Sequence, residues 1–216
     1  MSDVDLQVHV SEELLSDPKL ATAAIAVAAD DGVVTLRGTV ASLRQKIEAQ
    51  RDAERVYGVK KVENDLAVRL ISASRREDTE LRADVLQALM LDSLIPATVD
   101  AHVRDGLVTL TGIVDYQFQR EEAERVVINI VGVVNLNDEI RIAHPTPDAE
   151  DVKRSITEAF ERNAAIDAGR VRVSTSNDTV IVEGLVSSWT EHDAAIAAAW
   201  SAAGVKDVDD RIQVSY

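Results

Sequence analysis

Cysteine is missing from the sequence, and aromatic residues make up only 3% of it. Without cysteine there is no disulfide, no thiolate nucleophile and no cysteine-based metal site. The lack of cysteine does not distinguish an oxidising from a reducing compartment. With so few aromatic residues, any core must be built from Val, Ile, Leu and Ala. Such cores suit small units of sheet and helix.

Long apolar runs are also missing, since no window approaches the roughly 18 apolar residues of a membrane-spanning helix. The first residues, MSDVDLQVHVSEELL, lack the basic and apolar regions of a secretory signal. The 46% hydrophobic and 28% charged residues are typical of a soluble globular protein. We therefore expect a cytoplasmic protein without a transmembrane segment, or a periplasmic one if a signal has been removed.

The net charge is −15. A field of this sign opposes binding to nucleic acid, because the phosphate backbone is itself anionic. Binding to an anionic membrane surface is opposed in the same way, unless a local patch of basic residues carries positive charge. We expect no nucleic-acid partner.

One pattern occurs three times in the chain. Residues 31–40 read DGVVTLRGTV, residues 105–114 read DGLVTLTGIV and residues 177–186 read NDTVIVEGLV. A second glycine follows the last glycine of each stretch by 20 residues. Eight of the nine glycines occupy such repeat-equivalent positions: Gly32, Gly38, Gly58, Gly106, Gly112, Gly132, Gly184 and Gly204. A cofactor site would not be written three times, so these glycines indicate a structural repeat.

Each repeat predicts the element order α-β-β-α-β. A helix with spacing such as Leu81, Val85 and Leu89 comes first, and two alternating strands joined by a tight turn follow. A crossover helix then starts at a capping residue and ends at the second glycine, before a third strand. Ser42, Asp115 and Ser188 are the expected caps.

The hairpin makes the first two strands antiparallel, and the crossover helix makes the second and third parallel. The fold class is therefore α+β, with three tandem α-β-β-α-β units, each a three-stranded mixed sheet covered by two helices. We expect domains at residues 1–73, 77–143 and 148–216, separated by the stretches SASRRE and HPTPDA.

The pattern D-G-x-V-x-L-x-G-x-V, followed by G-V-x-x-V-x-[ND]-x-[LI], resembles the BON domain over nearly the whole chain. The resemblance implies an α-β-β-α-β fold and a non-catalytic role in osmotic or general stress. It also implies contact with phospholipid or envelope components, or a chaperone activity. The matched residues are structural, so the resemblance supplies no catalytic residue.

Side chains with reactive chemistry show no convergent pattern. His9, His102, His144 and His192 lack the spacing of a metal site, and the acidic clusters 121–124 and 207–210 fit solvated faces better than acid–base pairs. Ser188, His192 and Asp193 could suggest a hydrolytic trio, but Ser188 is better explained as a helix cap. We expect no enzyme activity, no cofactor and no metal.

Two groups of side chains suggest contact surfaces. The first is a basic cluster in the crossover helix of the first unit and just after it: Arg44, Lys46, Arg51, Arg55, Lys60 and Lys61. Interleaved acids favour a helix with internal ion pairs, while the alternative is a docking face for phosphate headgroups.

The second group is Trp189, Ile196 and Trp200 in the crossover helix of the third unit. The two tryptophans are eleven residues apart and share a helix face. Because the other units do not repeat their character, we expect this face to lie against another unit or a partner rather than in the unit's own core. Burial against another unit is favoured over contact with a membrane or ligand.

These features predict a stress-associated binding protein that contacts phospholipid or envelope components. The alternative is a cytoplasmic scaffold that binds proteins or acts as a chaperone. The basic cluster favours the first and the net charge favours the second.

Overall fold

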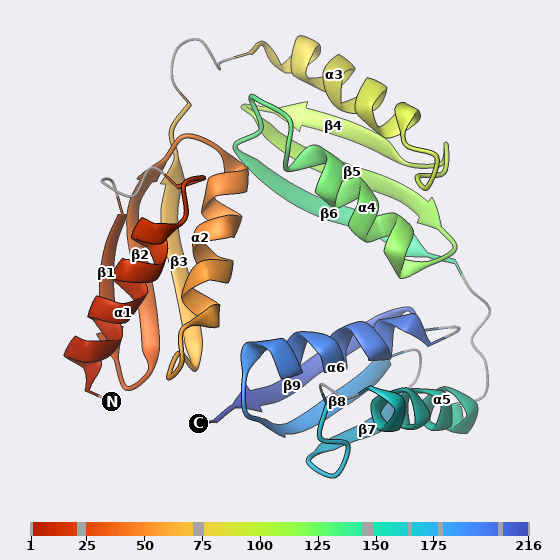
Figure 1. Cartoon of the computed structure of the whole chain (residues 1–216). Helices are drawn as coiled ribbons and strands as arrows, with labels where there is room; N and C mark the ends of the chain where they lie inside the picture. Colours follow the sequence, from red (N-terminus) through yellow and green to blue (C-terminus); the bar gives the residue numbers. More distant parts are fainter. Residues whose placement is uncertain are drawn as a thin grey trace.

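The computed structural model describes residues 2–20, 25–70, 76–143, 149–163, 166–176, 179–202 and 205–215. In these residues the chain forms three separate three-stranded sheets, each accompanied by two helices (Figure 1). The fold is α+β, and the element order α-β-β-α-β occurs three times, which confirms the predicted fold class.

The elements of each unit follow in the same order. Unit 1 contains α1 (Asp3–Ser16), β1 (Ile25–Asp30), β2 (Val33–Val40), α2 (Leu43–Arg55) and β3 (Lys61–Val68). Unit 2 contains α3 (Asp78–Leu91), β4 (Asp100–Arg104), β5 (Leu107–Val114), α4 (Gln117–Val127) and β6 (Asn135–Ile142). Unit 3 contains α5 (Ala149–Arg162), β7 (Val171–Ser176), β8 (Thr179–Val186), α6 (Trp189–Ser201) and β9 (Asp207–Val214).

The second strand of each unit lies in the middle of its sheet. In unit 1, β1 runs antiparallel to β2 and β3 runs parallel to it, so that Leu36 lies between Val27 and Asn64. The same pairing recurs in the other two sheets. The crossover helix joins the two parallel strands, as the sequence predicts.

Each unit has its own apolar core between the sheet and its two helices. In unit 1, Val34 and Leu36 of β2 are completely buried, because alternate side chains of a strand point to the same face. Ala49 and Ala53 of α2 are equally buried, and their small side chains let the helix lie close to the sheet. The core therefore needs almost no aromatic residues.

The repeated glycine of the middle strand is required by a close approach of two strands. At Gly184 the backbone φ is 152°, and a Cβ atom would lie 2.2 Å from the carbonyl oxygen of Arg170. At Gly112 the corresponding atom is the carbonyl oxygen of Thr98, at 2.4 Å. The glycine thus makes room for the backbone leading into the first strand rather than for a helix.

The helix caps agree with the sequence in two units. Ser42 and Ser188 accept hydrogen bonds from the third residue of α2 and α6, at 3.2 and 3.1 Å, which confirms both caps. The prediction for Asp115 is wrong, since α4 begins after Tyr116. There the side chain of Gln119 reaches back and accepts from the backbone N–H of Asp115 at 2.9 Å.

The crossover helices end earlier than the glycines suggest. The helix α2 ends at Arg55 and α4 ends at Val127, several residues before Gly58 and Gly132. In unit 1 a short turn follows, in which the N–H of Val59 donates to the carbonyl of Val56. The equivalent Gly204 and the turn at Asn177–Asp178 lie outside the described residues.

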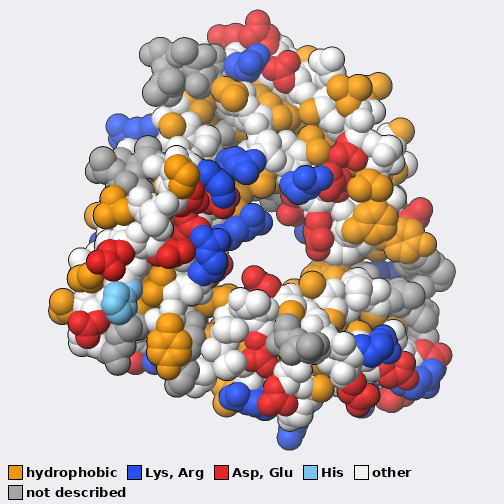
Figure 2. All heavy atoms as spheres, in the orientation of Figure 1, with side chains coloured by type: hydrophobic (Ala, Val, Ile, Leu, Met, Phe, Trp, Pro, Cys, Tyr) orange, Lys and Arg blue, Asp and Glu red, His pale blue; other side chains and the backbone are white. Residues whose placement is uncertain are grey.

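The three units lie at the corners of a triangle, with α2, α4 and α6 on its inner sides (Figure 1). A space-filling view shows an opening between the units (Figure 2). Among the described helices, each is too short or too polar to span a membrane. The crossover helices therefore form the surfaces through which the units meet.

Candidate functional site

The joint between units 1 and 2 is an apolar contact. Leu43, at the start of α2, is only 5% exposed and belongs to the core cluster of unit 2, where Ile47 also packs. Beside it, the guanidinium of Arg44 donates to the side-chain carbonyl of Asn129, just after α4. The first turns of α2 therefore dock on the carboxyl end of α4.

A cleft of about 640 Å³ lies next to this joint, between α2 and α4. Lys46 and Arg51 line it from unit 1, and Glu124 and Asp138 line it from unit 2. Burial, together with the neighbouring Asp138, raises the pKa of Glu124 to about 7. Positive and negative side chains thus face each other across the cleft.

The joint between units 3 and 1 depends on a tryptophan. The indole N–H of Trp189, at the start of α6, donates to the carbonyl oxygen of Val59 at 3.0 Å. The same ring meets His192 edge-on, with 4.8 Å between the ring centroids. Unit 3 therefore meets the loop after α2 through this hydrogen bond.

His192 is held between two carboxylates at this joint. Its Nδ1 lies 3.0 Å from Asp193 and its Nε2 lies 2.8 Å from Asp210. Burial acts to lower the pKa of His192, but the hydrogen bonds to Asp210 and Asp193 outweigh it, so the pKa is raised. Ser188 caps α6, so Ser188, His192 and Asp193 all have structural partners and do not form a nucleophile–base pair.

An aromatic pocket of about 320 Å³ lies between units 2 and 3. The rings of Tyr116 and Phe118 stack at 5.6 Å, and both side chains are about half exposed. Trp200, near the end of α6, lines the other side of the pocket. The side-chain oxygen of Gln117 is buried in its wall without a hydrogen-bond donor.

The predicted face on α6 is thus divided between two joints. Trp189 lies against unit 1 and Trp200 lies beside the first turn of α4. All three side chains, including Ile196 between the two tryptophans, also pack at the edge of the unit 3 core. The aromatic side chains of Tyr116 and Phe118 in unit 2 complete the pocket and were not predicted as site residues from the sequence. Two aromatic residues close together at a helix start were the available signal.

The six residues of the predicted basic cluster do not share one surface. Arg44, Lys46 and Arg51 face unit 2, as described above. Arg55 pairs instead with Asp52 and lies 3.4 Å from Glu13 of α1. Lys60 pairs with Asp31 at 3.1 Å and Lys61 pairs with Glu63 at 2.9 Å. Among the described residues, Arg44, Lys46 and Arg51 have no ion pair, and Arg44 is bonded to the neutral side chain of Asn129.

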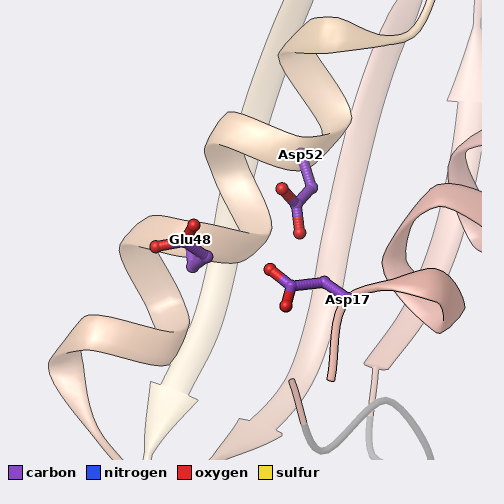
Figure 3. Close-up of side chains that lie close together, drawn as sticks. All are labelled: Asp17, Glu48 and Asp52. Carbon is purple, nitrogen blue, oxygen red and sulfur yellow. The ribbon is translucent and has the colours of Figure 1, made fainter. Parts of the chain in front are cut away.

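A cluster of three carboxylates lies between α1 and α2 and was missed by the sequence analysis. Oxygen atoms of Asp17, Glu48 and Asp52 lie within 4.8 Å of one another. Figure 3 shows Asp17, after the end of α1, facing Asp52 on α2, with Glu48 one helical turn before Asp52. Burial raises the pKa of Asp52 to about 6, against the effect of Arg55 and with help from Asp17.

Comparisons with known proteins agree with this architecture. The family model of the BON domain matches residues 2–69, 77–144 and 148–216. Osmotically-inducible protein Y of Escherichia coli (strain K12) is 30% identical over 146 residues, which cover 65% of this chain and 73% of that protein.

Two solved structures of CdsD, described as a structural protein of the type III secretion system of Chlamydia trachomatis, align with 98% and 100% of this chain. The alignments cover 92% and 100% of the two CdsD chains, and the sequence identity is 14% in both. With TM-scores of 0.28 and 0.27, they say nothing about how the units are arranged. The family matches, which together span nearly the whole sequence, show that the chain belongs to the BON domain family.

Proposed function

We propose that the chain is a non-catalytic binding protein associated with osmotic stress, and that it holds an apolar segment of another polypeptide in the aromatic pocket between units 2 and 3. The observation that carries this proposal is the exposure of Tyr116 and Phe118 beside Trp200. Exposed aromatic rings gathered in a pocket are typical of protein-binding hot spots.

The polar wall of the pocket supports a polypeptide ligand. The buried oxygen of Gln117 has no donor, whereas its amide group donates to Glu121 at 3.1 Å. An unmet buried acceptor is costly, and a backbone N–H of a bound segment would satisfy it. The pocket therefore combines apolar area for a side chain with an acceptor for the main chain.

Binding of a permanently unfolded polypeptide tests this proposal. Reduced, carboxymethylated α-lactalbumin carrying a fluorescent label would be titrated with the full chain and followed by anisotropy. We expect Phe118→Ser to weaken binding about tenfold, as loss of a well-packed aromatic contact does. Met90→Ser is the matched control, because Met90 is 85% exposed on α3 and lies outside the pocket.

The outcome against the proposal is equal binding by both variants, or no binding by the wild-type protein. Far-UV circular dichroism of each variant would show that the fold is intact. Binding lost equally with Met90→Ser would point to general surface stickiness rather than to the pocket.

A second candidate function is contact with anionic phospholipid, because Lys46 and Arg51 line the cleft between units 1 and 2 without an ion pair in the described part of the chain. Each basic side chain contributes about 1 kcal/mol near an anionic surface. Vesicles with and without anionic lipid, sedimented at two salt concentrations, test it. Salt-sensitive binding should be lost in Lys46→Glu/Arg51→Glu, and a protein that stays in the supernatant rules the candidate out.

The location expected from the amino terminus stays a prediction. Cell fractionation of the untagged chain would decide between the cytoplasm and the periplasm. Either compartment is compatible with a polypeptide ligand, whereas contact with a particular membrane surface depends on it.

A further inference from the structure

One buried carboxylate oxygen in unit 1 has no partner. The side chain of Asp52 is completely buried, and its Oδ1 is bonded by Arg55. Its Oδ2 receives no hydrogen bond and is closed off from solvent. Figure 3 shows this carboxylate directed at Asp17 across the space between α2 and the end of α1. A buried carboxylate oxygen of this kind destabilises a folded protein unless something binds it.

The other two units show that the fold does not require a carboxylate there. Counting from the repeated glycine of the middle strand, Asp52 corresponds to Val126 in unit 2 and to Ala198 in unit 3. Both of these side chains pack against their own apolar cores. Unit 1 has therefore placed a charged group at a position where its two copies have an apolar one.

The neighbouring cations do not balance the cluster. Lys19 donates to Glu48 at 2.7 Å and lies 3.7 Å from Asp17. Arg55 forms ion pairs with both Asp52 and Glu13. Four carboxylates thus share two basic side chains. Lys19 is 54% exposed and can turn away into solvent, which would free oxygens of Glu48 and Asp17.

We propose that unit 1 binds a divalent cation between α1 and α2, with carboxylate oxygens of Asp17, Glu48 and Asp52 as its protein ligands. The ligand set consists only of hard oxygen donors, which suit Ca²⁺ and Mn²⁺ and do not select zinc or copper. The site joins the loop after α1 to the middle of α2 and leaves the aromatic pocket untouched.

Calorimetric titration of the full chain with CaCl₂, and separately with MnCl₂, tests the site. We expect one cation per chain, with an affinity that falls at least tenfold in Asp52→Asn. Lys19→Met should raise the affinity, because it removes the side chain that competes for the same oxygens. Asp65→Asn is the matched control, since Asp65 is an exposed carboxylate on β3 paired with Arg37.

Asp52→Val keeps the test decisive if Asp52→Asn folds poorly. It introduces the residue of unit 2 at this position, so we expect a folded protein that no longer binds either cation. The proposal is overturned if the wild-type protein binds neither cation up to roughly 1 mM, the weak end of protein calcium sites. It is equally overturned if Asp52→Val binds like the wild type. If neither cation binds and Asp52→Val is more stable than the wild type, Asp52 instead shares a proton with Asp17.

Discussion

Units 1 and 3 have the same frame but different outer surfaces. In both, a serine caps the crossover helix, and two alanines one turn apart pack it on the sheet: Ala49 and Ala53 in α2, Ala195 and Ala199 in α6. The parallel and antiparallel strand pairs have matching registers. The positions that set the fold therefore carry similar residues in the two units.

Several positions of the crossover helices outside this frame carry different residues. Leu43 of unit 1 corresponds to Trp189 of unit 3, Glu54 corresponds to Trp200, and Asp52 corresponds to Ala198. Leu43, Trp189 and Trp200 lie at joints or in a pocket, and Asp52 belongs to the carboxylate cluster. The repeated residues therefore build a common scaffold. The contacts specific to each unit come from the few positions of the crossover helix at which the units differ.

The largest effect should come from breaking the shared frame in unit 3. In Gly184→Ala the new Cβ would meet the carbonyl oxygen of Arg170, and the backbone would keep a φ that disfavours side chains. We expect a loss of about 3 kcal/mol in the free energy of unfolding of this unit. Urea denaturation followed by tryptophan fluorescence measures it, because both tryptophans belong to unit 3.

Gly169→Ala is the control for this experiment. A Cβ at Gly169 would meet only the side chain of Asp167, at 3.4 Å, which is an ordinary contact. We expect its unfolding midpoint to stay close to that of the wild type. If Gly184→Ala were equally stable, the close approach of the two strands would not be the reason for the repeated glycine.

A smaller effect should come from the joint where the two units meet. Trp189→Phe keeps an aromatic ring but removes the N–H that donates to Val59. One such bond contributes about 1 kcal/mol, so amide hydrogen exchange in residues 56–62 should become roughly fivefold faster. Mass spectrometry of this peptide measures the change. Trp200→Phe is the control and should leave the peptide unchanged, because Trp200 faces unit 2.

The sequence predicts the frame well because the frame is repeated and local. Turn glycines, alternating strands and the capping serines each depend on residues close together in the chain, and three copies confirm one another. Asp115 shows the limit: unit 2 has no serine cap and keeps the contact made by the third helix residue, Gln119, whose side chain accepts from the backbone N–H groups of Asp115 and Tyr116. In unit 1 the equivalent Gln45 accepts from the N–H of Ala41 in addition to the serine cap.

The contacts between units were harder to predict, since they depend on how separate sheets dock. Leu43 reads as an ordinary core residue of unit 1, yet it is buried by unit 2. The carboxylate cluster brings together Asp17 and Asp52 from different helices, and each alone looks like a solvated acid. Aligning the three repeats would have found Asp52, because its two equivalents are apolar.

The smallest effect should come from His192, at the joint between units 3 and 1. Lys46 of unit 1 corresponds to His192 of unit 3, where Asp193, Asp210 and Glu54 all face the imidazole. A histidine whose folded pKa is raised contributes its full stabilisation below the unfolded value of about 6.5. That contribution is lost as the pH rises through the folded pKa.

Thermal unfolding of unit 3 should therefore move to lower temperature by a few degrees between pH 6 and pH 8.5. His192→Arg should abolish this dependence, because arginine stays protonated and unit 2 already pairs Arg120 with Asp138 at the equivalent positions. A wild-type profile as flat as that of His192→Arg would show that the pKa of His192 is the same in the folded and the unfolded protein. The hydrogen bonds to Asp210 and Asp193 would then only offset the cost of burying the imidazolium, and unit 3 would gain no stability from its charge at this joint.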